Sequence, residues 1–335
     1  MTRTMHSIGV CITALVTLWC VIETVEWNKK SSLVSGRWMR TTAETKSNHR
    51  RLNGILDPRS VIVKATVNEV ATTEDVVLMK KPKMYTFYEP TPIVWGDKRA
   101  TGMTDEADAA MLALWVQEWA RMGWEPVILS LNDAKRHPRY DEFHQRLRDV
   151  PLHGANGNND FNQLYNQYCY LRWLAMATLP HGGYMSDYDT LPIRRFAATI
   201  GSFTVYNTGP DGRGVPCLMS GSQTEWERLI WALLDVGLKH PDHNNWTDML
   251  GLMELKGTYV AEKTAFEAII IMNGQEWSPQ QCAMFDGINA VHFSHNSVMH
   301  GVVKAGEDLL DRAKISERVL QGFHENCDVA LHQSR

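Results

Sequence analysis

The sequence of 335 residues contains no C-x-x-C pair, so it lacks the cysteine spacing that is typical of a structural zinc site. It has no excess of basic charge either. The formal net charge is −4 and the isoelectric point is about 6.4, which gives no reason to expect nucleic acid as a partner. Hydrophobic residues make up 44% and charged residues 21% of the chain. This composition is that of a globular protein with one sizeable core or two modest ones.

Cysteine is scarce, whereas tryptophan is abundant. Two of the six cysteines, Cys11 and Cys20, fall in the apolar N-terminal stretch. The other four could form two disulfides in an oxidising compartment, with three possible pairings that the sequence leaves open: Cys169, Cys217, Cys282 and Cys327. Twelve tryptophans are present. We expect most of them to pack in the core.

Charge is absent from Thr4 to Ile22, and the run from Ile8 to Ile22 is densely apolar. A membrane-spanning helix needs about 20 such residues. No A-x-A cleavage site follows, so we expect an uncleaved signal-anchor helix over 8–25, whose orientation the flanking charges specify only weakly. A cleaved secretory signal peptide is the alternative. Residues 26–82 are polar and lack sustained periodicity, which indicates a stem or linker.

The remainder predicts an α/β domain. A β-prone run from Lys83 to Tyr88 is followed by a helical pattern from Asp105 to Met122, with Gly123 as its cap, and by a continuous apolar strand over 125–131. This order is that of a βαβ unit in a parallel sheet. Further elements follow: helices from 138, over 160–178 and over 224–238, and strands over 202–206 and 215–219. We expect a mixed, mainly parallel sheet within a domain over 83–305, then a C-terminal helix and tail over 306–335 with no chemical signal.

Ligands of open α/β sheets bind at the carboxyl ends of the strands. Tyr85, Phe87 and Tyr88 on the first strand, and Asn132 and Asp133 after the second, are therefore candidates to hold a nucleoside. Core aromatic residues and a helix cap are the alternative interpretation of the same residues.

The stretch from His181 to Ile193 contains the pattern D-x-D. Gly182 and Gly183 allow a close backbone approach, as a bound ligand would require. If Asp187 and Asp189 lie on one strand, both side chains project on the same side. Two such carboxylates fit a hard divalent cation that shares its other positions with phosphates. A solvated turn without a ligand is the alternative.

A charged residue, Arg172, stands among apolar neighbours on the helix that precedes this stretch. A buried arginine needs an anionic partner. A structural aspartate, the phosphates of a nucleotide sugar and Asp187 itself all meet that requirement.

The helix Tyr170–Leu179 and the following G-G-Y-x-D-x-D stretch together resemble the sugar-binding region of DXD-type glycosyltransferases, in particular the α-1,6-mannosyltransferase and α-1,4-galactosyltransferase group. One position departs from the group, because Cys169 stands where an aspartate is frequent. The resemblance implies a GT-A-like, Rossmann-type nucleotide-sugar domain. It also implies Asp187 and Asp189 as metal-binding and catalytic residues, and a set of donor-binding residues: Tyr85, Phe87, Arg172, Gly183, Tyr184 and Asp187.

Near the C-terminus, residues 288–298 resemble the terminal A-V-H-H-x-x-x-S-W element of that group. His292 matches the first histidine and is the expected third metal ligand, whereas Phe293 and Val298 replace the second histidine and the tryptophan. His295 is the alternative ligand. Asp248 is a candidate catalytic carboxylate or, alternatively, the first residue of a helix.

The resemblance implies a hexosyltransferase of the Golgi or endoplasmic reticulum. It further implies a single-pass type II membrane protein, with residues 1–7 as a cytoplasmic tail and the catalytic domain in the lumen. The expected cofactors are Mn²⁺ or Mg²⁺ and a UDP- or GDP-sugar donor, and the acceptor is a glycan or glycoconjugate. The group mostly retains anomeric configuration. Asn245-Trp246-Thr247 is an N-glycosylation sequon, usable in the lumen. A membrane-tethered carbohydrate- or protein-binding module that has lost activity is the alternative.

Overall fold

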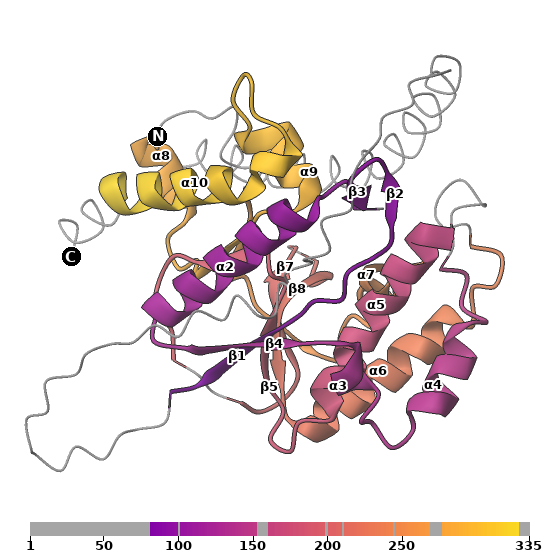
Figure 1. The fold of residues 1–335 in the computed structure, drawn as a ribbon. Coiled ribbons are helices and arrows are strands. Elements are labelled where there is room, and N and C mark those ends of the chain that lie inside the picture. The colour runs from indigo at the N-terminus through magenta and orange to yellow at the C-terminus, as the bar shows by residue number, and fades with distance from the viewer. Residues whose placement is uncertain are drawn as a thin grey trace, which may run out of the picture. The chain divides into compact units, whose positions relative to one another are not determined.

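Six strands form the central sheet of the domain (Figure 1). The structure is a computed structural model and describes residues 81–99, 101–152, 160–197, 200–209, 211–243, 245–268 and 277–327. The strands lie in the order β4-β1-β5-β8-β7-β9, with these bounds: β4 Glu125–Leu129, β1 Lys83–Phe87, β5 Gly183–Ser186, β8 Gly214–Gly221, β7 Thr204–Thr208 and β9 Val260–Ala261. The pairs β4–β1, β1–β5 and β7–β9 are parallel, and β5–β8 and β8–β7 are antiparallel.

The domain contains a second sheet of three strands, which the chain enters directly after β5. This sheet has the order β10-β11-β6, with β10 at Ala265–Glu267, β11 at Ala290–His292 and β6 at Thr190–Pro192. Since β5 ends at Ser186 and β6 begins at Thr190, the D-x-D residues lie where the chain passes from one sheet to the other. A short hairpin of β2 (Ile93–Trp95) and β3 (Lys98–Arg99) precedes helix α2.

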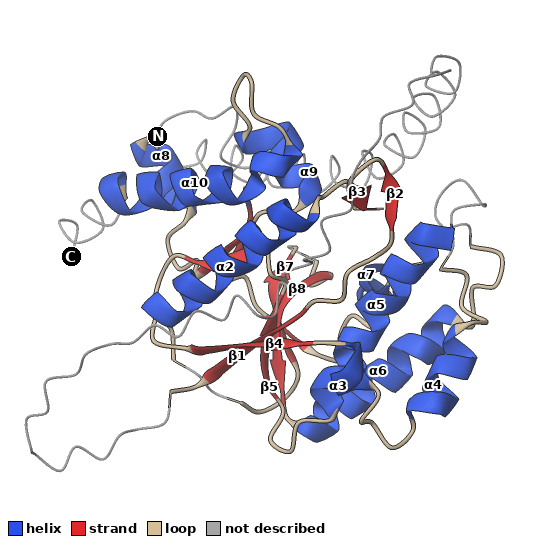
Figure 2. Ribbon diagram, viewed as in Figure 1, coloured by secondary structure: helices blue, strands red, loops and turns tan. Residues whose placement is uncertain are grey.

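Helices cover both faces of the central sheet (Figure 2). Consecutive strand residues alternate between two cores: Met84, Tyr184 and Leu218 belong to one, and Tyr85, Met185 and Met219 to the other. The first core includes α2 (Asp105–Arg121), α8 (Pro279–Met284) and α10 (Arg312–Asn326), and the second α4 (Tyr140–Leu147), α5 (Asp160–Ala177), α6 (Gln223–Gly237) and α7 (Asp248–Glu254). Shorter elements complete the domain: α3 (Leu131–Ala134), α9 (His295–Ser297), a π-helical turn at Val298–Val302 and a 3₁₀ turn at Leu309–Asp311.

The predicted α/β fold with a mixed, mainly parallel sheet is confirmed. Helix α2 begins after Thr104, whose side chain accepts a hydrogen bond from Ala107 N, and Gly123 follows its end with φ +92°, as the sequence predicted. Most of the tryptophans of the described chain serve packing, and Trp115, Trp119, Trp173 and Trp226 are fully buried.

The expected signal anchor over 8–25 lies outside the described residues, as does the stem apart from its last two residues. Within the described ranges, no helix combines the length and apolar character that a bilayer crossing requires. Of the four cysteines beyond that stretch, Cys282 and Cys327 form a disulfide, whereas Cys169 and Cys217 are free thiols.

The glycine pair at the start of β5 allows a close backbone approach, as the sequence predicted, and the neighbours that approach are parts of the protein itself. Gly182 has φ +65°, and a Cβ there would overlap the carbonyl oxygen of Gly221 and lie 2.6 Å from the carbonyl carbon of Ser222. A Cβ on Gly183 would lie 2.9 Å from the ring of Tyr85. The glycines therefore let β5 approach the β8–α6 junction and the Tyr85 ring.

Replacing Gly182 with alanine should test this close approach, because Gly96 offers a matched control. Gly96 has nearly the same φ, +66°, but a Cβ there would meet nothing within 4 Å. We expect Gly96→Ala to lower the free energy of unfolding by about 1 kcal/mol through backbone strain alone, and Gly182→Ala by about 3 kcal/mol or more through strain and overlap together. Urea unfolding of the two variants measures the difference, and equal losses would contradict the packing role.

Candidate metal centre at the carboxyl edge of the sheet

The D-x-D residues lie at the carboxyl ends of three adjacent parallel strands. β1 ends at Phe87, β4 at Leu129 and β5 at Ser186, and their registers place these ends side by side. Asp187 follows β5 directly. The two aspartates do not share a strand as we predicted: Asp187 to Asp189 form a turn closed by a hydrogen bond from Thr190 N to Asp187 O (2.9 Å). They converge because of this turn, and strand alternation plays no part.

Helix α2 holds the turn from behind. Trp115 Nε1 donates to Ser186 Oγ (2.9 Å), and Trp119 Nε1 donates to Thr190 O (3.1 Å), one bond on each side of the turn. Between them Tyr188 donates its hydroxyl to Asp108 Oδ1 (3.1 Å). Asp108 is buried and also accepts from the hydroxyl of Tyr88. The three α2 residues are seven and four positions apart, so they share one face of the helix.

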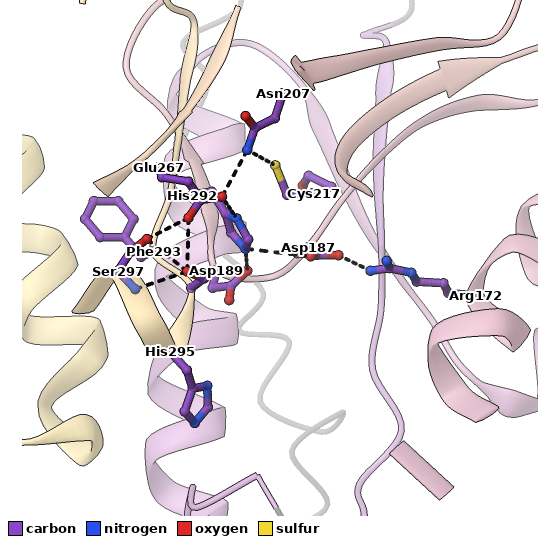
Figure 3. A network of polar contacts seen from close by, with 12 residues as sticks. Arg172, Asp187, Asp189, Asn207, Cys217, Glu267, His292, Phe293, His295 and Ser297 are labelled. Atoms are coloured by element: carbon purple, nitrogen blue, oxygen red, sulfur yellow. Dashed lines mark hydrogen bonds and ion pairs between the residues drawn. The ribbon is translucent and has the colours of Figure 1, made fainter. Parts of the chain in front are cut away.

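Asp187 is held on one side by Arg172 of α5 (Figure 3). The Arg172 guanidinium contacts Asp187 Oδ1 and donates to Asp248 Oδ2 (2.7 Å). The other oxygen, Asp187 Oδ2, lies 3.8 Å from His292 Nε2. About a quarter of the Asp187 side chain is exposed (25%), so this carboxylate reaches solvent.

Asp189 is more deeply buried and is held by Arg312, the first residue of α10. The Arg312 guanidinium contacts Asp189 Oδ2. Asp189 Oδ1 lies 3.4 Å from His292 Nε2 and has no hydrogen-bond partner in the described part of the chain. One oxygen of each aspartate is therefore bound to an arginine and the other faces His292.

His292 is oriented by Glu267. The two residues are directly paired in the parallel strands β11 and β10, and Nδ1 of His292 lies 2.6 Å from Glu267 Oε1. Glu267 also accepts hydrogen bonds from Asn207 Nδ2 (3.0 Å), Ser294 Oγ (3.0 Å) and Ser297 Oγ (2.6 Å). This leaves Nε2 of the imidazole directed at the two aspartates (Figure 3).

Three potential ligand atoms therefore converge: one oxygen each from Asp187 and Asp189, and one nitrogen of His292, all within 4.8 Å of one another. A second group with the same spacing comprises Cys217, Glu267 and His292. Both oxygens of Glu267 already accept two close contacts each, so the first group is the better candidate for a cation.

Burial and charge act in opposite directions on these groups. Burial raises the pKa of Asp187 to about 6, against the effect of Arg172. Burial also disfavours ionised Asp189, but Arg312 and His292 outweigh it and hold the pKa of Asp189 below its usual range. Burial disfavours protonated His292, yet Glu267, Cys217 and Asp189 raise its pKa well above the usual value. The cluster thus attracts positive charge to the space between the carboxylates.

Asp248 is the first residue of α7, after the cap Thr247, and it is buried. Its Oδ2 accepts hydrogen bonds from Arg172 and from Trp173 Nε1 (3.0 Å). Arg172 therefore has two of the partners that we considered, a structural aspartate and Asp187. Asp248 is therefore the first residue of a helix, as in the alternative interpretation, and it supports Arg172; its catalytic role stays a prediction.

The other predicted donor-binding residues do not join the cluster. Tyr184 is buried in the core against Trp124 and Tyr206, Tyr85 packs on Gly183, and Phe87 lies near Tyr168. Asp133 caps the short helix α3 by accepting from Ser130 N, as in the alternative interpretation. Of this set, Phe87 and Tyr88 remain at the carboxyl edge.

The departures from the resembled group have structural roles. Phe293 and Val298 are fully buried in the first core. His295 is turned away from the aspartates, since its Nε2 contacts Thr101 O (2.5 Å) and its Nδ1 lies 3.4 Å from Arg312. His292 is therefore the histidine that reaches the cluster.

The sequence did not reveal several residues of the site. Residues 306–335, in which the sequence shows no chemical signal, contribute Arg312, whose guanidinium contacts Asp189. Glu267 and Asp108 also went unnoticed, since each is a single acidic residue without a surrounding motif. One sequence feature could have pointed to these residues: each is a charged residue at a position where the helical or strand pattern faces the core. They are Asp108, Glu267 and Arg312.

Residues 68–204 match a protein family described as a domain of unknown function (DUF8765). The matched range contains Arg172, Asp187 and Asp189 but ends before Glu267, His292 and Arg312. The comparison with curated proteins gave no match.

Asp248→Asn should destabilise the fold, because it removes the charge that partners buried Arg172. We expect the free energy of unfolding to fall by about 2–4 kcal/mol. Asp235→Asn is the matched control: Asp235 pairs with Arg146 on the surface, and its loss should change stability by about 0.5 kcal/mol or less. Urea unfolding measures both. Unchanged stability of Asp248→Asn, together with loss of any activity, would support a catalytic role.

Proposed function

We propose that the protein is a divalent-metal-dependent glycosyltransferase that moves a sugar from a nucleotide-diphosphate sugar to a glycan or glycoconjugate. The observation that carries the proposal is the convergence of Asp187 Oδ2, Asp189 Oδ1 and His292 Nε2 at the carboxyl edge of an α/β sheet. Ligands of such sheets bind at this edge. The resemblance of 170–193 to DXD-type glycosyltransferases supplies the reaction class.

The donor atoms fit a divalent cation. Two carboxylate oxygens suit Mg²⁺ and Mn²⁺, and the imidazole nitrogen favours Mn²⁺ over Mg²⁺, which prefers oxygen. Each of the three ligands is held at its far side, by Arg172, Arg312 or Glu267, as the outer partners of metal ligands commonly are. A cation bound there would act as a Lewis acid on the diphosphate leaving group.

The charge of the cluster is consistent with one such ion. Three carboxylates contact two guanidinium groups, and a fourth, that of Glu267, contacts His292. The other members are Asp187, Asp189, Asp248, Arg172 and Arg312. When Nε2 of His292 ligates a cation the imidazole is neutral, and the net charge of this group without the cation is minus two. One divalent cation would balance it, which a buried cluster favours.

The chain's own residues would place the donor. The end of β1, at Phe87 and Tyr88, lies beside Asp187 and would receive the nucleoside. Arg172, whose Nε has no hydrogen-bond partner among the described residues, would offset negative charge on the donor beside Asp187.

The disulfide supports the proposed location in the lumen of the Golgi or endoplasmic reticulum, anchored through residues 8–25. Cys282 and Cys327 are bonded, and disulfides form and persist in oxidising compartments. Asn245, the sequon asparagine, is partly exposed and lies just before α7.

The first test is turnover by the full-length protein. We expect Mn²⁺-dependent hydrolysis of one donor in a panel of UDP- and GDP-sugars, with Asp187→Asn and Asp189→Asn lowering it by about 100-fold or more, because each removes a ligand charge. Asp235→Asn should behave as the unaltered protein. A folded protein that binds a donor with Mn²⁺ but never turns it over would favour the non-catalytic binding module instead.

The second test is thermal. Because an ion that binds the folded state alone stabilises it, Mn²⁺ at about 100 times its dissociation constant should add about 2.7 kcal/mol, a rise in Tm of about 5–10 °C. We expect a smaller rise with Mg²⁺ and none in Asp187→Asn. Scanning fluorimetry with and without each ion gives the result, and an equal rise in Asp187→Asn would place the cation elsewhere.

A further inference from the structure

Arg312 lies at the start of the C-terminal helix α10 and is almost completely buried, with 2% of its surface exposed. A buried guanidinium is costly unless its donors are used. Here Nε donates to Phe293 O (2.7 Å), one terminal nitrogen lies 3.4 Å from His295 Nδ1, and the other contacts Asp189 Oδ2. The planar group is therefore fixed in one orientation by three neighbours.

The helix that carries Arg312 is itself anchored at both ends. The turn before it is capped by Asp308, which accepts from Leu310 N (2.8 Å). Beyond its last residue, Cys327 is joined by the disulfide to Cys282 of α8. Its buried face, including Ile315 and Val319, belongs to the first core. Arg312 is thus a rigid reference point for the residue that it contacts.

The fixed position of Arg312 determines the orientation of the Asp189 carboxylate. One carboxylate oxygen is bound to Arg312, so the other must face away from it, and it lies 3.4 Å from His292 Nε2 without a hydrogen bond of its own among the described residues. A buried carboxylate oxygen without a donor is rare, and such a group calls for an explanation. A cation between Asp189, Asp187 and His292 would supply the missing partner.

We propose that Arg312 is a positioning residue for the cation site, which sets the rotamer of Asp189 so that its free oxygen faces His292. The inference rests on the proposed metal-dependent function and extends it to a residue of the C-terminal helix. A purely structural arginine that pins α10 would explain the contact with Phe293 O. It would not explain why the opposite oxygen of Asp189 is buried with only a 3.4 Å contact to His292 Nε2.

The test measures Mn²⁺ affinity and thermal stability separately, in the full-length protein. Free Mn²⁺ is followed by electron paramagnetic resonance during titration, and Tm is recorded without added metal. Arg312→Gln removes both the positive charge and the planar guanidinium with its several N–H donors, whereas Arg312→Lys keeps the charge but not the guanidinium. Arg318→Gln is the matched control, since Arg318 lies on the same helix and bonds Glu307 and Val302 O away from the aspartates.

We expect Arg312→Gln to weaken Mn²⁺ binding by about 10- to 100-fold, the usual effect of losing an outer partner of a metal ligand. Arg312→Lys should lie between this variant and the unaltered protein, and it keeps the test decisive if Arg312→Gln does not fold. Arg318→Gln should lower Tm without changing Mn²⁺ affinity by more than about twofold.

The contrary outcomes are distinct. Unchanged Mn²⁺ affinity in Arg312→Gln or Arg312→Lys, with a lowered Tm, would show a structural role and overturn the inference while leaving the metal site intact. Tighter binding would show that Arg312 competes with the cation, which also overturns it. If the unaltered protein binds no Mn²⁺, the proposed function and this inference fail together.

Discussion

The buried ion pair between Arg312 and Asp189 connects the C-terminal helix to the turn at the centre of the candidate site. Ionised carboxylates are costly to bury, and this cluster contains four of them in direct contact with guanidinium or imidazole groups. Arg172 of α5 compensates Asp187 and Asp248, Arg312 of α10 compensates Asp189, and His292 of β11 contacts Glu267. That requirement, more than any local motif, explains why α5, α7, α10 and the second sheet meet at one place.

The turn itself is shaped by a helix that contributes no ligand. Two indole donors and one buried carboxylate of α2 hold the backbone and the middle side chain of the turn, so the aspartates project from a rigid support. Sites built on such elements keep their geometry better than sites on free loops. In this arrangement the described residues of α2 donate no hydrogen bond to the carboxylate oxygens of Asp187 and Asp189 that face His292.

The sequence predicted the elements and the two aspartates but not their environment. Hydrophobic periodicity located α2, α5 and α6 to within about two residues, because periodicity reports burial directly. It could not show that the chain turns at Tyr188 to leave one sheet for another. Nor could it identify Glu267 or Arg312, since their partners lie 25 and 123 residues away. A charge on a buried helical or strand face marks such a residue only once the partner is known.

The wide sequence separation of the cluster has a consequence for biosynthesis. Contacts between distant residues form slowly, because bringing them together closes a long loop at a cost in chain entropy. Domains fold while the chain emerges from the ribosome, N-terminal parts first. Asp189 is made long before Arg312, 123 residues later, and Arg172 before Asp248, 76 residues later. During that interval Asp189 exists without the guanidinium of Arg312, so a nascent chain ending before α10 would carry this carboxylate unpaired, and completion of the last helix would supply its partner.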